Sequence, residues 1–426
     1  MLARTRGSRA SRIHFDSSPR EIRDTSAAKG TLHSVPSRKP RDILPAERGG
    51  LPPRIAEFLK TATLPTPCLV VDVELVARNY DDLAGALPEA LVYYAVKANP
   101  AEEILTRLAQ QGSNFDTASI GEIDLCLRLG VPASRLSFGN TIKKQRDIEA
   151  AFGRGVRLFA FDSAEELEKL AASAPGSKVF CRILVDCEGA EWPLSRKFGC
   201  ELPMAADLLA RAKDLGLDPY GISFHVGSQQ TDLNQFRNAI SQARTLFDAL
   251  SARGVSLRMI NVGGGFPSRY NRDVPDIACY AHAIRDAVKL GFPGQKIDII
   301  VEPGRYIVGD AGVIQSEVVL VSSKGGEDGR RWVYLDVGKF HGLIETMDEA
   351  IKYRVLTPHD GGETVSSILA GPTCDSADIL YEKADYRLPA ALKAGDRILI
   401  LSTGAYTTTY SSVAFNGMPP LASVCI

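Results

Sequence analysis

The feature that most constrains the fold is a repeat between residues 90 and 305, in which a short β-rich run is followed by a turn and an amphipathic stretch. Strands that alternate with helices predict a parallel sheet. Eight such units predict a closed (β/α)8 barrel of the TIM type, an α/β fold, with a doubly wound open sheet as the alternative. The eight predicted strands are residues 92–98, 114–119, 135–140, 157–162, 178–186, 220–227, 256–265 and 296–304.

The segments between these runs carry helix signals. Residues 101–112 have apolar side chains at helical spacing. Residues 119–130 and 163–176 each begin at a serine and end at or near a glycine, which are the residues that commonly start and stop helices. The spacing therefore predicts helices in all three segments.

After residue 305 the pattern changes to β runs without intervening helices, at residues 312–324, 330–338, 366–371 and 396–406. This pattern predicts a separate all-β domain, a barrel or a sandwich, over residues 306–426. At the other end of the chain, residues 1–41 are rich in Arg and Ser. Asp16, Glu21 and Asp24 argue against a transit peptide, so we predict a disordered tail there.

The composition excludes several classes of protein. Hydrophobic residues make up 45% and charged residues 24% of the chain, and the net charge of −1 gives no electrostatic preference for nucleic acid or an anionic membrane. The eight cysteines form no CxxC pair and the six histidines are scattered, so we predict no metal site. The cysteines are typical of reduced thiols in the cytoplasm. Because no run of about 18 uncharged apolar residues is present, we predict no membrane span.

Polar side chains at the predicted strand ends indicate where the chemistry occurs, because barrel active sites lie at the carboxyl ends of the strands. For Asp162, capping the next helix is as good an interpretation as a role at the site. For Asn140, making a turn is as good an interpretation as a role at the site. The strand-end residues are Lys97, Asp116, Asn140, Asp162, Arg182, His225, Gly263, Gly264, Gly265, Glu302 and Arg305.

These residue types together favour pyridoxal 5′-phosphate (PLP). Lys97 is either a salt-bridged lysine or a nucleophile that forms a Schiff base. The sequence GGG at 263–265 lets backbone N–H groups approach an anion, and Arg305 can add a bidentate phosphate contact. Glu302 can keep a pyridine nitrogen protonated, and His225 is either a core residue or stacks on the ring.

At this point the chain resembles the PLP-dependent group IV decarboxylases with the alanine-racemase-like fold, which include ornithine, lysine/ornithine, diaminopimelate and biosynthetic arginine decarboxylases. The resemblance covers about residues 65–426. The motifs that carry it, in the order of the family, are YAVKAN (94–99), FDTAS (115–119), FHVGSQ (224–229), GGGFP (263–267), EPGR (302–305), GPTCDSAD (371–378) and GAYTTTYSSVAFNG (404–417).

The resemblance implies a role for each matching residue. It implies that Lys97 holds the cofactor, that His225 stacks on it and that Cys374, from the partner subunit, is the proton donor. The implied cofactor contacts are Lys97, Asp116, Arg182, His225, Ser228, Gly263, Gly264, Gly265, Glu302, Pro303, Gly304, Arg305 and Tyr406. The implied substrate contacts are Leu335, Asp336, Asp375 and Phe415.

The resemblance also implies a homodimer with two shared active sites. Its domain organisation would be a PLP-binding barrel over residues 75–305, with residues 42–74 packing together with residues 306–426 in the β domain.

The same likeness implies a decarboxylation. Racemases with this fold place an arginine at the pyridine nitrogen, whereas this chain has Glu302. Asp375 and Asp336 provide two carboxylates for a basic chain end, so the resemblance favours L-ornithine, which would be converted to putrescine and CO2 in polyamine biosynthesis. A dual lysine/ornithine decarboxylase is the alternative, and a diaminopimelate decarboxylase fits less well. A non-catalytic regulator is disfavoured because Lys97, Glu302 and Cys374 are all present.

Overall fold

The computed structural model of the protein describes residues 50–192, 197–325 and 330–426, and these belong to one compact unit. The prediction of a disordered tail at residues 1–41 therefore lies outside the described residues. In the described part of the chain, no helix is both long enough and apolar enough to cross a membrane.

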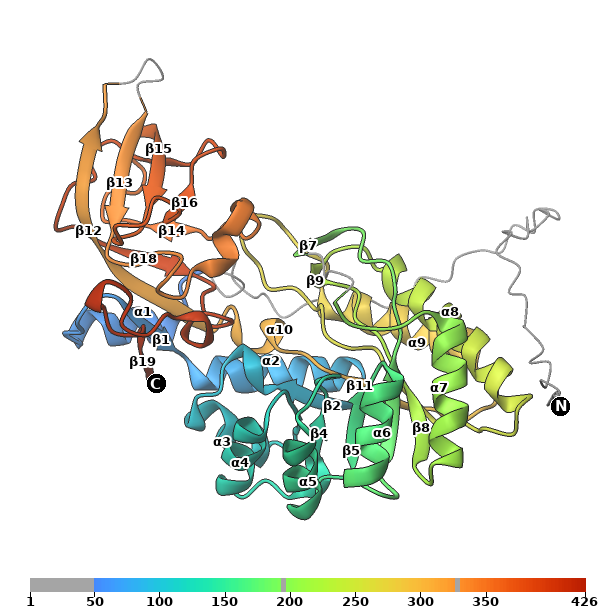
Figure 1. The fold of residues 1–426 in the computed structure, drawn as a ribbon. Helices are drawn as coiled ribbons and strands as arrows, with labels where there is room; N and C mark the ends of the chain where they lie inside the picture. The colour runs from blue at the N-terminus through green and yellow to red at the C-terminus, as the bar shows by residue number, and fades with distance from the viewer. Residues whose placement is uncertain (1–49, 193–196, 326–329) are drawn as a thin grey trace, which may run out of the picture. The chain divides into compact units, whose positions relative to one another are not determined.

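Eight parallel strands close into a barrel, which confirms the barrel and excludes the open sheet (Figure 1). Closure is made by the last strand pairing with the first, with Ile300 beside Leu91. The strands in ring order are β2 (Ala90–Ala95), β3 (Asn114–Thr117), β4 (Leu136–Phe138), β5 (Leu158–Phe161), β6 (Lys178–Arg182), β8 (Asp218–Ser223), β10 (Met259–Asn261) and β11 (Asp298–Val301).

The inside of the barrel is filled by side chains, as in other barrels of this size. One buried cluster draws its members from six of the eight strands, namely Tyr93, Leu158, Ala160, Phe180, Tyr220, Met259 and Ile300. Because this cluster occupies the interior, a ligand can bind only beyond the strand ends.

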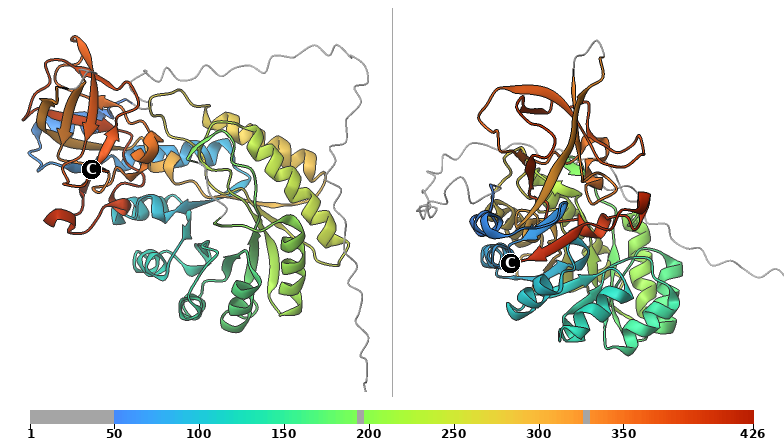
Figure 2. Two further views of the ribbon diagram at one scale, coloured as in Figure 1. Left: turned by 45° about the horizontal axis from the view of Figure 1, so that its top comes forward. Right: turned by 90° about the vertical axis from the view of Figure 1, so that its left-hand side faces the viewer.

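Helices follow the strands and cover the barrel from outside (Figures 1 and 2). Two of them begin at the predicted serines: Ser119 Oγ accepts the N–H of Glu122, and Ser163 Oγ accepts that of Glu166. The helices are α2 (Val73–Ala86), α3 (Glu102–Gln110), α4 (Ile120–Arg128), α5 (Gln145–Gly153), α6 (Ala164–Ser173), α7 (Leu202–Asp214), α8 (Asn234–Ser251) and α9 (Ile277–Gly291).

Nine of the remaining strands form one sheet. Its members are β1 (Cys68–Val71), β12 (Gly312–Ser323), β13 (Arg331–Leu335), β14 (Val355–Leu356), β15 (Thr364–Ala370), β16 (Ile379–Tyr381), β17 (Arg387–Pro389), β18 (Arg397–Leu401) and β19 (Ala422–Cys425). Strand β1 lies between β12 and β19, so a strand that precedes the barrel in sequence is part of this sheet. Helix α1 (Pro53–Thr61) packs on it through Ile55. The domain boundaries at residues 75 and 305 stay a prediction.

Several short elements differ from the predicted pattern. Strand β2 ends at Ala95, so Lys97 lies in the 3-10 turn η1 (Val96–Ala98) and not in a strand that runs to residue 98. Strand β6 ends at Arg182, and β7 (Ala190–Trp192) then pairs with β9 (Ser228–Gln230) in a small sheet of its own. Helix α10 (Arg305–Val308) and the 3-10 segment η3 (Ile344–Glu349) also lie outside the predicted pattern, because elements this short have no readable periodicity.

Candidate active site

A pocket of about 350 Å3 opens at the carboxyl ends of the barrel strands. Its lining combines residues from barrel strand ends with Glu345, Tyr406 and Tyr410 from the C-terminal part of the chain. The structure thus brings together most of the residues predicted from the sequence. These are Lys97, Asp116, Arg182, His225, Ser228, Gly264, Gly265, Glu302, Gly304, Arg305 and Tyr406.

Lys97 faces this pocket from η1. Its Nζ lies 3.1 Å from Asp116 Oδ2 at the end of β3, and its side chain is 47% exposed because the pocket is open to solvent. After Lys97 the backbone leaves the direction of strand β2, because the buried Asn99 side chain donates to Gly404 O and accepts the N–H of Ala101. Partial loss of hydration lowers the pKa of Lys97, but the charges of Asp116, Tyr406 and Glu302 together raise it above its ordinary value. The free amine is therefore protonated at neutral pH.

Glu302 enters the same pocket directly after β11. Asn261 at the end of β10 donates a side-chain hydrogen bond to its Oε1. Burial, helped by the charge of Asp116, raises the pKa of Glu302 to about 7, while Lys97, Asn261 and Arg182 act in the opposite direction. A cationic nitrogen placed beside this carboxylate would stabilise its ionised form.

His225 follows β8, and its Nδ1 accepts the N–H of Gly227 at 3.1 Å. Burial lowers the pKa of His225 well below its ordinary value, and the charges of Arg182 and Lys97 lower it further. The ring is therefore neutral, with its proton on Nε2. A neutral ring that lines the pocket is suited to stacking on a flat cofactor.

The glycines leave room that any other residue would fill. A Cβ on Gly265, where φ is +97°, would lie 2.6 Å from Gly227 O, and a Cβ on Gly304 would lie 2.8 Å from the Cβ of Ala98. Gly263 lies just behind, held by its N–H on Asn261 Oδ1, and Pro303 O accepts the N–H of Ala95. The donor-rich space beside Gly265 fits a phosphate group, so the residues present fit PLP.

Arg305 lies at this phosphate end and is fully buried. Its Nε donates to Ser228 Oγ at 3.1 Å, its NH1 donates to Tyr270 Oη at 2.6 Å, and its terminal nitrogens bind both oxygens of Glu345. The guanidinium carbon lies 5.0 Å from the centre of the Tyr406 ring. Sequence reasoning missed Glu345 and Phe198, which lie in short irregular segments without a recognisable motif, and Tyr410, which lies within the motif at 404–417 but was not singled out.

Leu335 and Asp336 do not line this pocket. Leu335 is buried at the end of β13, and Asp336 Oδ1 accepts hydrogen bonds from Ser316 Oγ at 2.6 Å and Glu317 N at 2.9 Å. Both residues are thus engaged in the β sheet. The prediction that they contact substrate is not supported within a single chain.

Cys374, Asp375 and Phe415 also lie away from the pocket of their own chain. Cys374 is exposed and is held by Asn416, whose Oδ1 accepts the Cys374 N–H at 3.1 Å. Asp375 Oδ1 accepts the N–H of Ala377, and the Phe415 ring packs 4.9 Å from Phe340. Their predicted roles therefore require a second subunit.

The two ambiguous strand-end residues are now distinguished. Asn140 makes a turn, because its Oδ1 accepts the N–H of Ile142 and its Nδ2 donates to Ala118 O, and it also lines the pocket. Asp162 does not cap α6, since Ser163 does so. Its carboxylate instead accepts the N–H of Gly199 at 2.7 Å.

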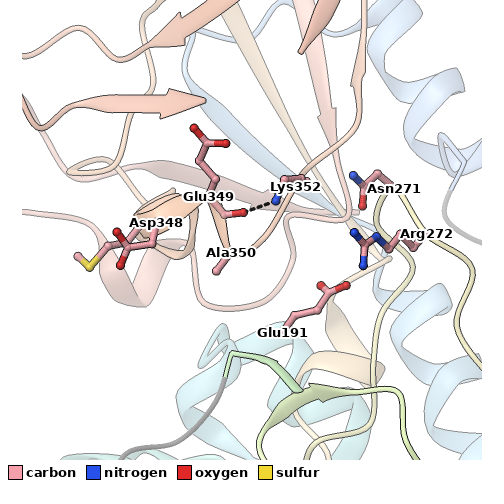
Figure 3. Close-up of a pocket in the computed structure, with 8 residues that line it drawn as sticks. Glu191, Asn271, Arg272, Asp348, Glu349, Ala350 and Lys352 are labelled. Atoms are coloured by element: carbon pink, nitrogen blue, oxygen red, sulfur yellow. Dashed lines mark hydrogen bonds between the residues drawn. The ribbon is translucent and has the colours of Figure 1, made fainter. Parts of the chain in front are cut away.

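A second cavity, of about 600 Å3, lies beside η3 (Figure 3). Residues 347–350 line it together with Glu191, Asn271, Arg272 and Lys352. Lys352 Nζ donates to Glu349 O. The charged residues around it are three carboxylates, Glu191, Asp348 and Glu349, and two cations, Arg272 and Lys352.

Fold and pocket together define a barrel protein with a lysine positioned for attachment to a phosphate-bearing cofactor. Comparison with known proteins agrees with this. Residues 73–309 match the family model described as "Pyridoxal-dependent decarboxylase, pyridoxal binding domain". The chain belongs to the PLP-dependent group IV decarboxylase family.

Two curated relatives are similar over most of their length. A lysine/ornithine decarboxylase of Selenomonas ruminantium is 38% identical over 355 residues, which cover 83% of this chain and 88% of the relative. Mouse (Mus musculus) ornithine decarboxylase is 35% identical over 363 residues, covering 82% of this chain and 78% of the relative.

Solved structures give the same result. A crystal structure of SrLDC in complex with PLP and cadaverine aligns with a TM-score of 0.79 at 35% identity, covering 88% of this chain and 94% of that one. The arginine decarboxylase of Paramecium bursaria Chlorella virus bound to agmatine aligns with a TM-score of 0.79 at 29% identity, covering 87% of this chain and all of that one. The chain is therefore a PLP-dependent amino-acid decarboxylase of the ornithine, lysine or arginine type.

Proposed function

We propose that the protein converts L-ornithine to putrescine and CO2, with PLP held in the strand-end pocket. The observation that carries the proposal is that Lys97, Glu302 and His225 line one pocket with the glycine cradle. PLP supplies an electron sink for the bond that breaks at the substrate α-carbon. The carboxylate at Glu302 favours decarboxylation because it keeps the ring nitrogen protonated.

Each residue then has a defined task. Lys97 Nζ would hold the cofactor covalently, and Asp116 orients Lys97 from 3.1 Å. Glu302 would hold a proton at the ring nitrogen. The neutral His225 ring would lie against the cofactor, and Ser228 and the 263–265 loop would hold the phosphate.

The proposal includes a homodimer with shared active sites. Cys374 and Asp375 lie on an exposed loop, as expected for residues that complete the site of a partner. Cys374 of that loop would return a proton to the α-carbon, and Asp375 would bind the terminal ammonium of the substrate. The proposed location is the cytoplasm, because the eight cysteines of the sequence form no CxxC pair and are typical of reduced thiols.

Lysine is the strongest alternative substrate. It is one methylene longer than ornithine, and a pocket discriminates one methylene by only ~1–3 kcal/mol. The similarity to a lysine/ornithine decarboxylase also favours dual use. Diaminopimelate fits less well, because Asp375 would repel its second carboxylate.

One assay panel tests the proposal. The purified holoenzyme is incubated separately with ornithine, lysine, arginine and diaminopimelate, and the released amines and CO2 are quantified. Putrescine as the dominant product supports the proposal, whereas cadaverine or agmatine as the main product would contradict it. The Lys97→Ala variant is the control, and it should fold but release no amine and bind no cofactor covalently.

A further inference from the structure

The pocket contains a buried ion pair for which the proposed reaction has no use. Arg305, the first residue of α10, and Glu345 in η3 are 40 residues apart in sequence and have side chains that are only 3% and 4% exposed. NH1 of Arg305 donates to Glu345 Oε2 at 2.8 Å, and NH2 donates to Oε1. The pairing is therefore bidentate, the strong and directional form of this contact.

The pairing with Glu345 determines which edge of the Arg305 guanidinium remains available to a phosphate. A guanidinium has five N–H groups. Glu345 takes two of them, Tyr270 Oη takes a third, and Nε donates to Ser228 Oγ. The edge that carries Nε is the one directed at Ser228, at the phosphate end of the pocket.

The carboxylate also cancels the charge of Arg305. A buried guanidinium without a counter-ion is strongly unfavourable, so something must balance it when no phosphate is bound. Glu345 does so from within the chain. Both of its oxygens accept hydrogen bonds from Arg305, so its charge is engaged within the chain.

We propose that Glu345 is a positioning residue for the cofactor, acting as the built-in counter-ion of Arg305. It keeps the phosphate cradle folded and correctly oriented before the cofactor arrives, and it presents the phosphate with a neutral donor edge in place of an unpaired cation. The inference rests on PLP binding in this pocket, but it is independent of which amino acid is decarboxylated.

The test compares the response of apo-proteins to inorganic phosphate. In Glu345→Gln the charge of Arg305 lacks its partner, so the apo-protein should melt at a lower temperature than the wild type. Phosphate should then replace the missing anion, binding about tenfold or more tightly than to the wild type and raising the melting temperature further. Equal phosphate affinity in the two proteins, or weaker affinity in the variant, would overturn the proposal.

A matched control is Glu166→Gln. Glu166 is 3% exposed and forms an ion pair with Lys143 at 2.9 Å, but it does not line the pocket. This variant should also melt at a lower temperature, yet its affinity for phosphate should equal that of the wild type. A phosphate gain of the same size in Glu166→Gln would mean that the effect is general destabilisation, and it would count against Glu345.

A second variant keeps the test decisive if Glu345→Gln does not fold. The conservative variant Glu345→Asp keeps the negative charge, so it should fold, but its shorter side chain loosens the bidentate pairing with Arg305. The apo-protein should therefore bind inorganic phosphate more tightly than the wild type, by a smaller factor than Glu345→Gln. Phosphate affinity equal to or weaker than that of the wild type in this folded variant would contradict the proposal. Neither measurement requires turnover, so a failure to produce putrescine leaves this test intact.

Discussion

At the scale of single residues, the site depends on how the charges of Lys97, Asp116 and Glu302 act on one another. Asp116 and Glu302 both raise the pKa of the lysine, and Asp116 also raises that of Glu302. The protonation of Lys97 and that of Glu302 therefore depend on each other and on the charge of Asp116. Changing Asp116 should shift the titration of both groups as well as remove its own contact.

The first prediction concerns Asp116→Asn. Loss of the carboxylate removes the largest contribution that raises the pKa of Lys97, while burial continues to lower it, so that pKa should fall. The unprotonated amine attacks the cofactor, so covalent attachment of PLP to the apo-protein should reach its half-maximal rate at lower pH than in the wild type. The measurement is the attachment rate, followed by visible absorbance across pH.

The surface pair of Asp124 with Arg154 supplies the control for this experiment. Asp124→Asn removes a carboxylate of the same kind that does not line the pocket, and it should leave the pH profile unchanged. If Asp116→Asn also had the wild-type profile, Asp116 would not set the proton affinity of Lys97.

The second prediction concerns the stability of the apo-protein. The pKa of Glu302 is about 7 in the folded chain against 4.5 as its ordinary value, so the folded state binds more protons than the unfolded state between these values. The stabilisation is complete below pH 4.5 and is lost as the pH rises to about 7. At 1.36 kcal/mol per pKa unit, the free energy of unfolding falls by on the order of 3 kcal/mol over this pH range.

Glu302→Gln should abolish this pH dependence. Urea unfolding of the apo-proteins at pH 5 and pH 8 measures it. From pH 5 to pH 8, the free energy of unfolding of the wild type should fall relative to that of the variant. If the difference between the two proteins were the same at both pH values, the pKa of Glu302 would not be raised. In the holoenzyme the same variant should lose most of its decarboxylase activity, because an amide cannot hold the ring nitrogen protonated.

At the scale of elements, the sequence predicted regular structure well and short structure poorly. The eight barrel strands and the serine-capped helices α4 and α6 were predictable because periodicity and caps are local signals. Site residues at strand ends were predictable for the same reason, since they follow from the strand positions. Glu345 was not predictable, because its partner Arg305 is 40 residues away and no local sequence pattern indicates that the two residues pair.

The third prediction concerns the loop that follows β10. In Gly265→Ala the methyl group would lie 2.6 Å from Gly227 O at a φ of +97°, so both steric contact and backbone strain oppose it. We expect a loss of about 1–3 kcal/mol in the free energy of unfolding together with weaker PLP binding. Gly254→Ala separates the two effects, because Gly254 has a φ of +73° with nothing within 4 Å. Gly254→Ala should lower the free energy of unfolding by less and leave the PLP affinity unchanged. A wild-type PLP affinity in Gly265→Ala would contradict the proposal that the 263–265 loop holds the phosphate.

At the scale of the whole molecule, segments from both ends of the chain build one sheet beside the barrel. Strand β1 joins β12 and β19, and the loops of the same C-terminal part provide Glu345, Tyr406 and Tyr410 to the pocket. That part also carries Cys374 and Asp375, which lie on an exposed loop and do not line the pocket of their own chain. A complete site as we propose it therefore needs residues from two chains.

Subunit mixing tests this arrangement. Lys97→Ala and Cys374→Ala should each have little activity, since every site of either homodimer lacks one essential group. If the two proteins are expressed together and pair at random, half of the dimers are mixed, and each mixed dimer has one site with both groups intact. The mixture should then recover about one quarter of the wild-type activity. A mixture of Lys97→Ala with the Lys97→Ala/Cys374→Ala double variant provides no intact site and should stay inactive. If the first mixture also stayed inactive although tagged subunits prove that mixed dimers form, Lys97 and Cys374 would not act across the interface.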